Sequence, residues 1–451
     1  MSTTNARCAG VLLHPTSLPS GKLDADVWRF LDWMTEANLK VWQMLPLTQP
    51  VDGLSPYQAV SAFALNPALL PDNWQDTVDK TAFADFMANP PHWLKPYALF
   101  TLLKQQSGGK AWNEWPDAWR FRDADTLAAV EREHADALHA ICMEQFALIS
   151  CWLAIRQEAN RRGIRLFGDI PIFVGYDSVD VWSNPHEFQL DEQLQPTVVT
   201  GVPPDYFSAT GQRWGNPHYH WPHMLANGFR WWQQRMAWSL ELFDLVRIDH
   251  FRGLEASWEI PSSEPTAMVG EWVKAPGAEL LAALQGSHST LPVVAEDLGI
   301  ITPEVVELKN RFGLPGMSVL QFGFNGLPDN PHSLAEQVEN SVVYTGTHDN
   351  ETSLGWWQAL TDEGQKSWIL SQLDLTIGDM PWPLIHAALQ SPAQMAIIPL
   401  QDFLGLDNQA RMNTPGTIVD NWLWRYDSHQ LTPDLAQRIA HLVDAAERSA
   451  E

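Results

Sequence analysis

In the stretch Asp244-Leu-Val-Arg-Ile-Asp-His-Phe-Arg-Gly253, a short apolar strand ends in an arginine and a carboxylate two residues apart. Side chains alternate along a strand, so Arg247 and Asp249 face the same side. A guanidinium beside a carboxyl group lowers the pKa of that group and keeps it ionised. Asp249 is therefore suited to act as a nucleophile. The alternative is an ordinary ion pair that closes the strand, and this stretch alone does not separate the two.

Two later apolar stretches also end in acidic residues. They are Leu291-Pro-Val-Val-Ala-Glu-Asp-Leu-Gly299 and Ser341-Val-Val-Tyr-Thr-Gly-Thr-His-Asp-Asn350. Three strand-end carboxylates meet only if their strands are parallel neighbours. A (β/α)8 barrel has that arrangement, with its chemistry at the C-terminal ends of the strands. The sequence therefore predicts an α/β protein built on a (β/α)8 TIM barrel.

The remaining chain supplies the alternation of strands and helices that a barrel needs. Besides the strands before Asp249 and Glu296, strands are expected at Ala9–His14, Val41–Leu47, Arg165–Val174, Met317–Phe322, Val342–His348 and Met395–Leu400. Helices are expected at Asp24–Ala37, Phe229–Phe243, Pro276–Gln285, Pro303–Phe312 and Pro433–Arg448, and within Ser353–Leu389.

Two long connections interrupt this alternation, so a single catalytic barrel over residues 1–451 is expected to carry inserted subdomains on the C-terminal face of its strands. Residues 49–163 follow the second strand, and their Pro-rich loops and helical segments predict an inserted subdomain. Residues 176–226 follow the third strand as a long irregular connection. Connections of this length are usually functional or disordered, and this one is too aromatic for disorder. We expect an aromatic active-site loop there.

The composition excludes several partners. The chain has 28 Lys and Arg against 54 Asp and Glu, a net charge of −26, which disfavours nucleic acid and anionic membranes. There is no run of 18 apolar residues, and Met1 to Gly10 has neither a basic nor an apolar region, so neither a membrane span nor a leader sequence is expected. Cys8, Cys142 and Cys151 lack metal-ligand spacing, which predicts reduced thiols in a cytoplasmic protein.

The 23 tryptophans are the most specific feature of the composition. Indole rings stack on the flat C–H faces of sugars, so tryptophans beside loop motifs indicate carbohydrate binding. For any single tryptophan, packing in the core or in an interface is the alternative.

The three strand-end acids fit glycosyl transfer, which needs one ionised and one protonated carboxyl group. Asp249 is the expected nucleophile. Glu296 follows an apolar run, where desolvation raises its pKa toward the role of an acid. Asp349, next to His348, would bind sugar hydroxyls and stabilise the transition state. The alternative for each acid is a helix N-cap or a surface acid just past a strand, which we keep for Asp297.

Several motifs resemble those of a known family. The three strand ends and Gly168-Asp-Ile-Pro-Ile-Phe-Val174 resemble the four short motifs of the α-amylase clan. Longer motifs are similar to the 4-α-glucanotransferases of glycoside hydrolase family 77, the amylomaltases, from about Gly10 to Arg425. These motifs are Leu13-His-Pro-Thr-Ser-Leu-Pro19, Trp42-Gln-Met-Leu-Pro-Leu47, Ser55-Pro-Tyr57, Ser61-Ala-Phe63, Gly201-Val-Pro-Pro-Asp-Tyr-Phe-Ser208, Gly211-Gln-Arg-Trp-Gly-Asn-Pro217 and Thr347-His-Asp-Asn350.

The resemblance implies Asp249 as nucleophile, Glu296 as general acid/base and Asp349 as transition-state stabiliser. The residues it implies for substrate binding are Tyr57, Asp169, Arg247 and His348, together with Tyr206, Phe207 and Trp214 of a lid. A lid that excludes water favours transfer to a sugar over hydrolysis. A packed loop that only caps the barrel is the alternative for the lid.

Three positions depart from the family pattern. His218 replaces the usual Leu, Asp420 the usual Gly before Asn421-Trp422, and Val179 the usual Ala of an Asp-Ser-Ala-Asp motif. None of them is one of the three acids, so they bear on acceptor preference and product size.

The expected function is transfer of α-1,4-glucan segments between maltooligosaccharides, with no metal or organic cofactor. One alternative is an α-1,4-glucan hydrolase with the same acids and a leakier lid. A second is a non-catalytic glycan-binding protein, which the presence of all three acids disfavours. A third is a metal-dependent barrel hydrolase, which needs His-x-His where this chain has His14-Pro15-Thr16. No calcium-loop pattern is present.

Overall fold

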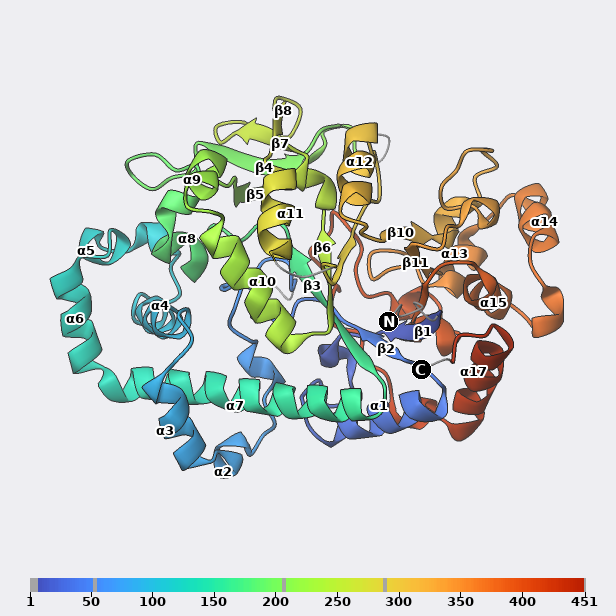
Figure 1. Ribbon diagram of the computed structural model, residues 1–451, viewed down its shortest axis with the longest axis horizontal. Helices are drawn as coiled ribbons and strands as arrows, with labels where there is room; N and C mark the ends of the chain where they lie inside the picture. The colour runs from blue at the N-terminus through green and yellow to red at the C-terminus, as the bar shows by residue number, and fades with distance from the viewer. Residues whose placement is uncertain (1–6, 52–54, 205–207, 287–289, 450–451) are drawn as a thin grey trace.

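The computed structural model describes residues 7–51, 55–204, 208–286 and 290–449. Its centre is an eight-stranded parallel sheet (Figure 1). The strands are β1 (Cys8–Leu12), β2 (Val41–Gln43), β3 (Arg165–Pro171), β6 (Leu245–Asp249), β9 (Val293–Ala295), β10 (Gly316–Val319), β11 (Ser341–Tyr344) and β12 (Met395–Pro399). The order across the sheet is β10-β11-β12-β1-β2-β3-β6-β9.

The two ends of this order meet, and the sheet becomes a barrel. The N–H of Ala295, at the end of β9, donates to the carbonyl of Pro315 just before β10, at 2.9 Å. Each strand also neighbours the strands before and after it in this set of eight. The predicted (β/α)8 barrel is confirmed.

The barrel strands are buried on both faces, as their nearly continuous apolar sequences require. All five residues of β1 and of β12 are buried. One apolar cluster draws on nearly every strand and therefore fills the inside of the barrel. Its members include Cys8, Leu12, Val41, Phe167, Val294, Val319, Val342, Tyr344 and Ile397.

Helices cover the outside of the barrel. They include α1 (Ala25–Glu36), α10 (Arg230–Leu242), α11 (Gly277–Gln285), α12 (Pro303–Arg311), α13 (Ser353–Ala359), α14 (Glu363–Ser371), α15 (Trp382–Gln390) and α17 (Pro433–Ala445). Their ends carry the expected caps, such as the Asp24 carboxylate that accepts the Asp26 N–H before α1.

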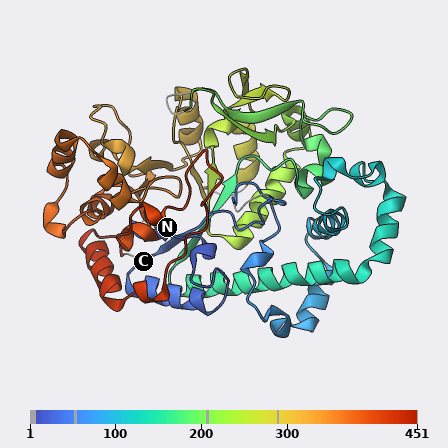
Figure 2. The same cartoon turned by 180° about the vertical axis from the view of Figure 1, so that it is seen from behind.

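Helices also fill the connection between β2 and β3. They are α2 (Trp74–Thr77), α3 (Lys80–Ala88), α4 (Leu94–Gln106), α5 (Asp117–Arg120), α6 (Ala124–Glu133) and α7 (Ala135–Arg161). Both views show them on one flank of the barrel, away from α13, α14 and α17 (Figure 1, Figure 2). We propose that they form the inserted subdomain of residues 49–163.

Helix α7 is long and apolar enough to span a membrane by length and composition alone. In this structure its apolar face packs into the core. Trp152 is fully buried, and its indole N–H donates to the carbonyl of Leu242 at 2.9 Å. The helix therefore packs here as a core helix of the domain.

A second, antiparallel sheet lies beside the barrel, and the sequence did not predict it. Its order is β5 (Gln212–Pro217), β4 (Val198–Val202), β7 (Ala256–Pro261) and β8 (Glu271–Lys274). Two of these strands fall in the connection of residues 176–226, which was expected to be irregular. That connection also contains α8 (Val179–Ser183) and α9 (Trp221–Ala226). The expectation failed because β4 pairs with β7, which follows β6 in the chain.

Candidate active site

The three acids that the sequence singled out follow three barrel strands. Asp249 is the last residue of β6, and Glu296 comes directly after β9. β11 ends at Tyr344, so Asp349 lies in the loop beyond it and not at the strand end where it was expected. All three still lie on the C-terminal side of the barrel. Asp297 has a different role, because it accepts the Met317 N–H at 2.7 Å and thereby joins the ends of β9 and β10.

Arg247 bonds two acidic residues, Asp169 and Asp249, which form the floor of this site. Its Nη2 donates to Asp249 Oδ1 at 2.6 Å, and its Nε donates to Asp169 Oδ1 at 3.0 Å. The side chains of Arg247 and Asp169 are 5% and 1% exposed. Tyr57 completes the group, because its hydroxyl donates to Asp169 Oδ2 at 2.6 Å. A single buried cation therefore holds two carboxylates in place.

The pKa of Asp249 differs from the expectation. Burial raises it most, the charges of Asp169, Glu296 and Asp349 raise it further, and Arg247 lowers it. The expectation of a lowered pKa for Asp249 was wrong. It left out burial, which is the largest cause, and it counted Arg247 as the partner of Asp249 alone, whereas the guanidinium also bonds Asp169.

Glu296 is held by the backbone. Its Oε2 accepts the His250 N–H at 2.6 Å, and its Oε1 accepts the Leu298 N–H at 2.8 Å. Burial raises the pKa of Glu296, while Arg247 and these two N–H groups lower it. Glu296 and Asp249 interact, so they titrate as a pair and keep a proton at pH values where exposed acids are ionised. Arg247 bonds Asp249 directly, which favours the negative charge there and the proton on Glu296.

Aromatic rings form the wall beside Asp349. Tyr57 stacks on His348 with ring centroids 5.3 Å apart. His348 Nε2 lies 3.4 Å from Asp349 Oδ1, and burial lowers the pKa of His348. The side chain of Asp349 is 48% exposed, so it is open to a ligand. The wall thus combines an apolar surface with a carboxylate, which suits a sugar ring and its hydroxyls.

The lid residues are only partly described. Trp214 lies in β5, and its ring meets that of His250 edge-on at 4.8 Å. Trp214 thus contacts the side chain of the residue whose backbone N–H donates to Glu296. Tyr206 and Phe207 lie outside the described residues.

Two residues at the site were not predicted from the sequence. Asn413 donates from Nδ2 to Asp349 Oδ1 at 2.6 Å, and the ring of Trp422 lies 5.9 Å from that of His348. The only signal was the departure at Asp420. Its φ of 61° lies in the left-handed region that glycine adopts without steric cost, which accounts for the usual Gly there.

Among the described residues, no three His, Cys, Asp or Glu side chains are grouped to hold a metal ion. The chemistry that the arrangement supports is acid/base and nucleophilic. A partly buried pair of carboxyl groups sharing a proton, next to aromatic rings, can cleave a glycosidic bond through a covalent intermediate.

Comparisons with known proteins agree with this chemistry. The profile of a family described as 4-alpha-glucanotransferase matches residues 12–73 and 71–432. A 4-alpha-glucanotransferase of Thermus thermophilus is 43% identical, over 98% of this chain and 99% of the relative. One of Synechocystis is 40% identical, over 97% of each chain. The structure of amylomaltase from Streptococcus agalactiae in complex with acarbose superposes with a TM-score of 0.94 at 32% identity, covering 98% of this chain and 99% of the other.

Proposed function

Since the chain belongs to the 4-alpha-glucanotransferase family, we propose that it transfers α-1,4-glucan segments between maltooligosaccharides by a retaining double displacement. The observation that carries the mechanism is the pairing of two partly buried acids. Arg247 bonds Asp249, which favours the negative charge there, and burial favours the proton on Glu296.

In the first step, an oxygen of Asp249 forms a bond to the anomeric carbon of the donor. The bond from that carbon to the glycosidic oxygen breaks, and Glu296 gives its proton to the departing 4-oxygen. The product is a covalent β-glucosyl ester on Asp249. The carboxyl group is accessible for this attack because 31% of the Asp249 side chain is exposed.

In the second step, the 4-hydroxyl of an acceptor sugar attacks the same carbon and gives its proton to Glu296. The ester bond to Asp249 breaks, and both acids return to their starting states. Two inversions leave the configuration unchanged. The reaction uses only carboxyl groups, so it requires neither a metal ion nor an organic cofactor.

The donor sugar is held around these acids. We assign this binding to Tyr57, Asp169, Arg247, His348 and Asp349, on the strength of their contacts with one another. Water must be kept from the ester for transfer to dominate. We assign this exclusion to Trp214, which contacts the side chain of His250, and to Tyr206 and Phe207 of the same segment.

The partners and compartment follow from the same proposal. The partners are α-1,4-glucans and maltooligosaccharides, which are neutral and compatible with a net charge of −26. We place the protein in the cytoplasm, supported by three cysteines that are all free thiols.

The test is incubation of the purified protein with maltotriose, following free glucose, reducing ends and the oligosaccharide ladder together. We expect products longer than maltotriose at a constant number of reducing ends, and none with Asp249→Asn. Growth of reducing ends without longer products would identify an α-1,4-glucan hydrolase instead. No products at all, with maltotriose still bound, would favour a glycan-binding protein.

A further inference from the structure

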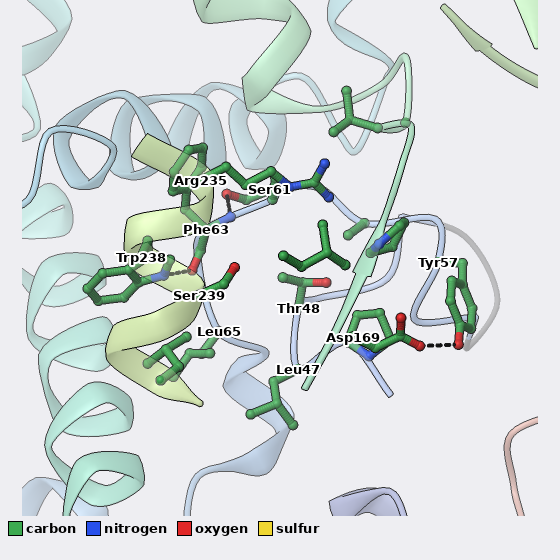
Figure 3. A pocket seen from close by; sticks show the side chains of 18 of the residues that line it. Leu47, Thr48, Tyr57, Ser61, Phe63, Leu65, Asp169, Arg235, Trp238 and Ser239 are labelled. Carbon is green, nitrogen blue, oxygen red and sulfur yellow. Dashed lines mark hydrogen bonds between the residues drawn. The ribbon is translucent and has the colours of Figure 1, made fainter. Parts of the chain in front are cut away.

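Tyr57 lies on a loop of residues 55–65, of which Val60, Phe63 and Leu65 pack in the core. Beneath this loop lies a cavity of about 40 Å³, bounded on its far side by β3 and α10. That is room for roughly two or three water molecules. Figure 3 shows the cavity, with Tyr57 at one end and α10 at the other. The cavity leaves part of the loop's underside without packing, so hydrogen bonds contribute to holding the loop in place.

Those hydrogen bonds come from neighbouring helices, including α7, whose Gln145 donates to the carbonyl of Leu65 at 2.9 Å. From α10, the Trp238 indole N–H donates to the carbonyl of Phe63 at 2.8 Å (Figure 3). From the start of α8, the Val179 N–H donates to the carbonyl of Val60 at 2.9 Å. All three anchors hold carbonyl groups of the loop.

Three side chains accept N–H groups of the loop, and one of them is Gln145, whose Oε1 accepts the Leu65 N–H at 3.0 Å. Asp180 is 2% exposed, and its Oδ2 accepts the Ala62 N–H at 2.7 Å. Within the loop, the Ser61 hydroxyl accepts the N–H groups of Phe63 and Ala64 at 3.1 and 3.0 Å. The Ser61-Ala-Phe63 motif and the Asp177-Ser-Val-Asp180 motif thus meet, although the catalytic mechanism uses neither.

Burying a carboxyl group costs free energy unless hydrogen bonds or a nearby charge compensate for the lost water. Burial raises the pKa of Asp180 to about 6. The nearest cation is Arg235 on α10, which is 3% exposed and lies over the rings of Trp231 and Trp232 at 5.3 and 5.2 Å. Arg235 acts on Asp180 through its charge, while its Nη1 donates to the carbonyl of Ile172 at 3.5 Å. The hydrogen bond that the Asp180 side chain makes is the one to the Tyr57 loop.

We propose that Asp180 is a positioning residue for donor binding: through the Ala62 N–H it fixes the loop that holds Tyr57 against His348 and Asp169. The inference rests on the proposed function, in which Tyr57 contacts the donor sugar. Losing the anchor lets the loop drop toward the cavity and weakens donor binding. The acids on β6 and after β9 stay in place, so the chemical step is preserved.

The experiment compares KM and kcat for maltotriose in Asp180→Ala, Asp180→Asn and Tyr57→Ala, and in the Asp180→Ala/Tyr57→Ala double variant. We expect Asp180→Ala to raise KM about ten-fold and to change kcat by less than about two-fold. Asp180→Asn keeps an oxygen for the Ala62 N–H and restores KM to within about two-fold of the wild type. In the double variant, Asp180→Ala adds nothing to the effect of Tyr57→Ala, because the side chain it positions is gone.

Asp177→Ala is the matched control. Asp177 belongs to the same motif but bonds Lys104 and the Trp112 N–H rather than the loop, so we expect an unchanged KM. If Asp180→Ala does not fold, Ser61→Ala takes its place in the same cycle with Tyr57→Ala, with an expected rise in KM of about three-fold.

The outcomes separate this inference from the proposed function. The positioning role alone would be overturned if the KM increases of Asp180→Ala and Tyr57→Ala multiply in the double variant. It would also be overturned by an unchanged KM in Asp180→Ala. A raised KM in Asp180→Asn equal to that in Asp180→Ala would also overturn it. An unchanged KM in Tyr57→Ala would refute the donor contact of Tyr57 and this inference with it. Absence of longer products in the wild type would refute the proposed function itself.

Discussion

Replacing Asp169 with Asn removes one negative charge from the floor of the site and keeps its shape. Asp169 and Asp249 compete for the same guanidinium, at 3.0 and 2.6 Å from its nitrogens. Asp169 is also one of the groups that raise the pKa of Asp249. In Asp169→Asn the charge of Arg247 is left to Asp249, so the pKa of Asp249 falls.

The size of the shift follows from the spacing. Two charges bridged by one guanidinium lie roughly 6 Å apart, and at an effective dielectric constant of about 20 they repel by about 2.8 kcal/mol. That energy corresponds to roughly two pKa units. Asp249 is partly exposed, which screens the charge, so we expect a fall of about one unit.

The assay is the pH dependence of kcat/KM for maltotriose from about pH 4 to about pH 9, which reports the essential groups of the free enzyme. Asp249 must be ionised to attack, so activity rises with pH through its pKa. A lowered pKa moves this acidic limb of the profile to lower pH in Asp169→Asn, even if the overall rate falls.

Tyr57→Phe is the control for this experiment. It removes the hydroxyl that bonds Asp169 but keeps the charge of Asp169, so its acidic limb should not move to lower pH. An acidic limb that is unmoved or displaced to higher pH in Asp169→Asn would refute the reasoning that Asp169 holds the pKa of Asp249 up.

Three further predictions test the packing and the lid. Gly168→Ala would place a Cβ 2.3 Å from the ring of Phe243, so we expect the free energy of unfolding in urea to fall by about 1–3 kcal/mol; an unchanged midpoint would contradict this packing. Arg448 is fully buried and donates to backbone carbonyls at 2.5 and 2.7 Å. Arg448→Met should therefore lower the free energy of unfolding by about 3 kcal/mol with kcat unchanged, and lost activity in the folded variant would count against a purely structural role. Trp214→Ala opens the space next to His250 and should raise glucose release by water several-fold relative to transfer; a constant ratio would remove Trp214 from the lid.

The barrel and the placing of two acids could be predicted because their signals are local. Each strand is an apolar run, and Asp249 and Glu296 follow such runs directly. The loop position of Asp349 was harder to predict from the sequence. β11 ends at Tyr344, although the residues that follow are also compatible with a strand.

The features that the sequence missed depend on distant pairs. β4 pairs with β7, although β5 and β6 lie between them in the chain. No local sequence pattern indicates that pairing. Asn413, which bonds Asp349, lies 64 residues further along the chain. Asp169 of β3, which shares Arg247, adds to the rise that burial causes in the pKa of Asp249. In each case the decisive partner is fixed by the closed barrel and not by neighbours in sequence.

The central claim is that Asp249 forms the covalent intermediate while Glu296 handles the proton. The most direct test uses Glu296→Gln with maltotriosyl fluoride, whose leaving group needs no acid, followed by acid quenching and peptide mass spectrometry. The account predicts a peptide carrying one maltotriosyl group on Asp249, because the second step lacks its base. A label on another residue, or rapid fluoride release with no labelled peptide, would contradict it.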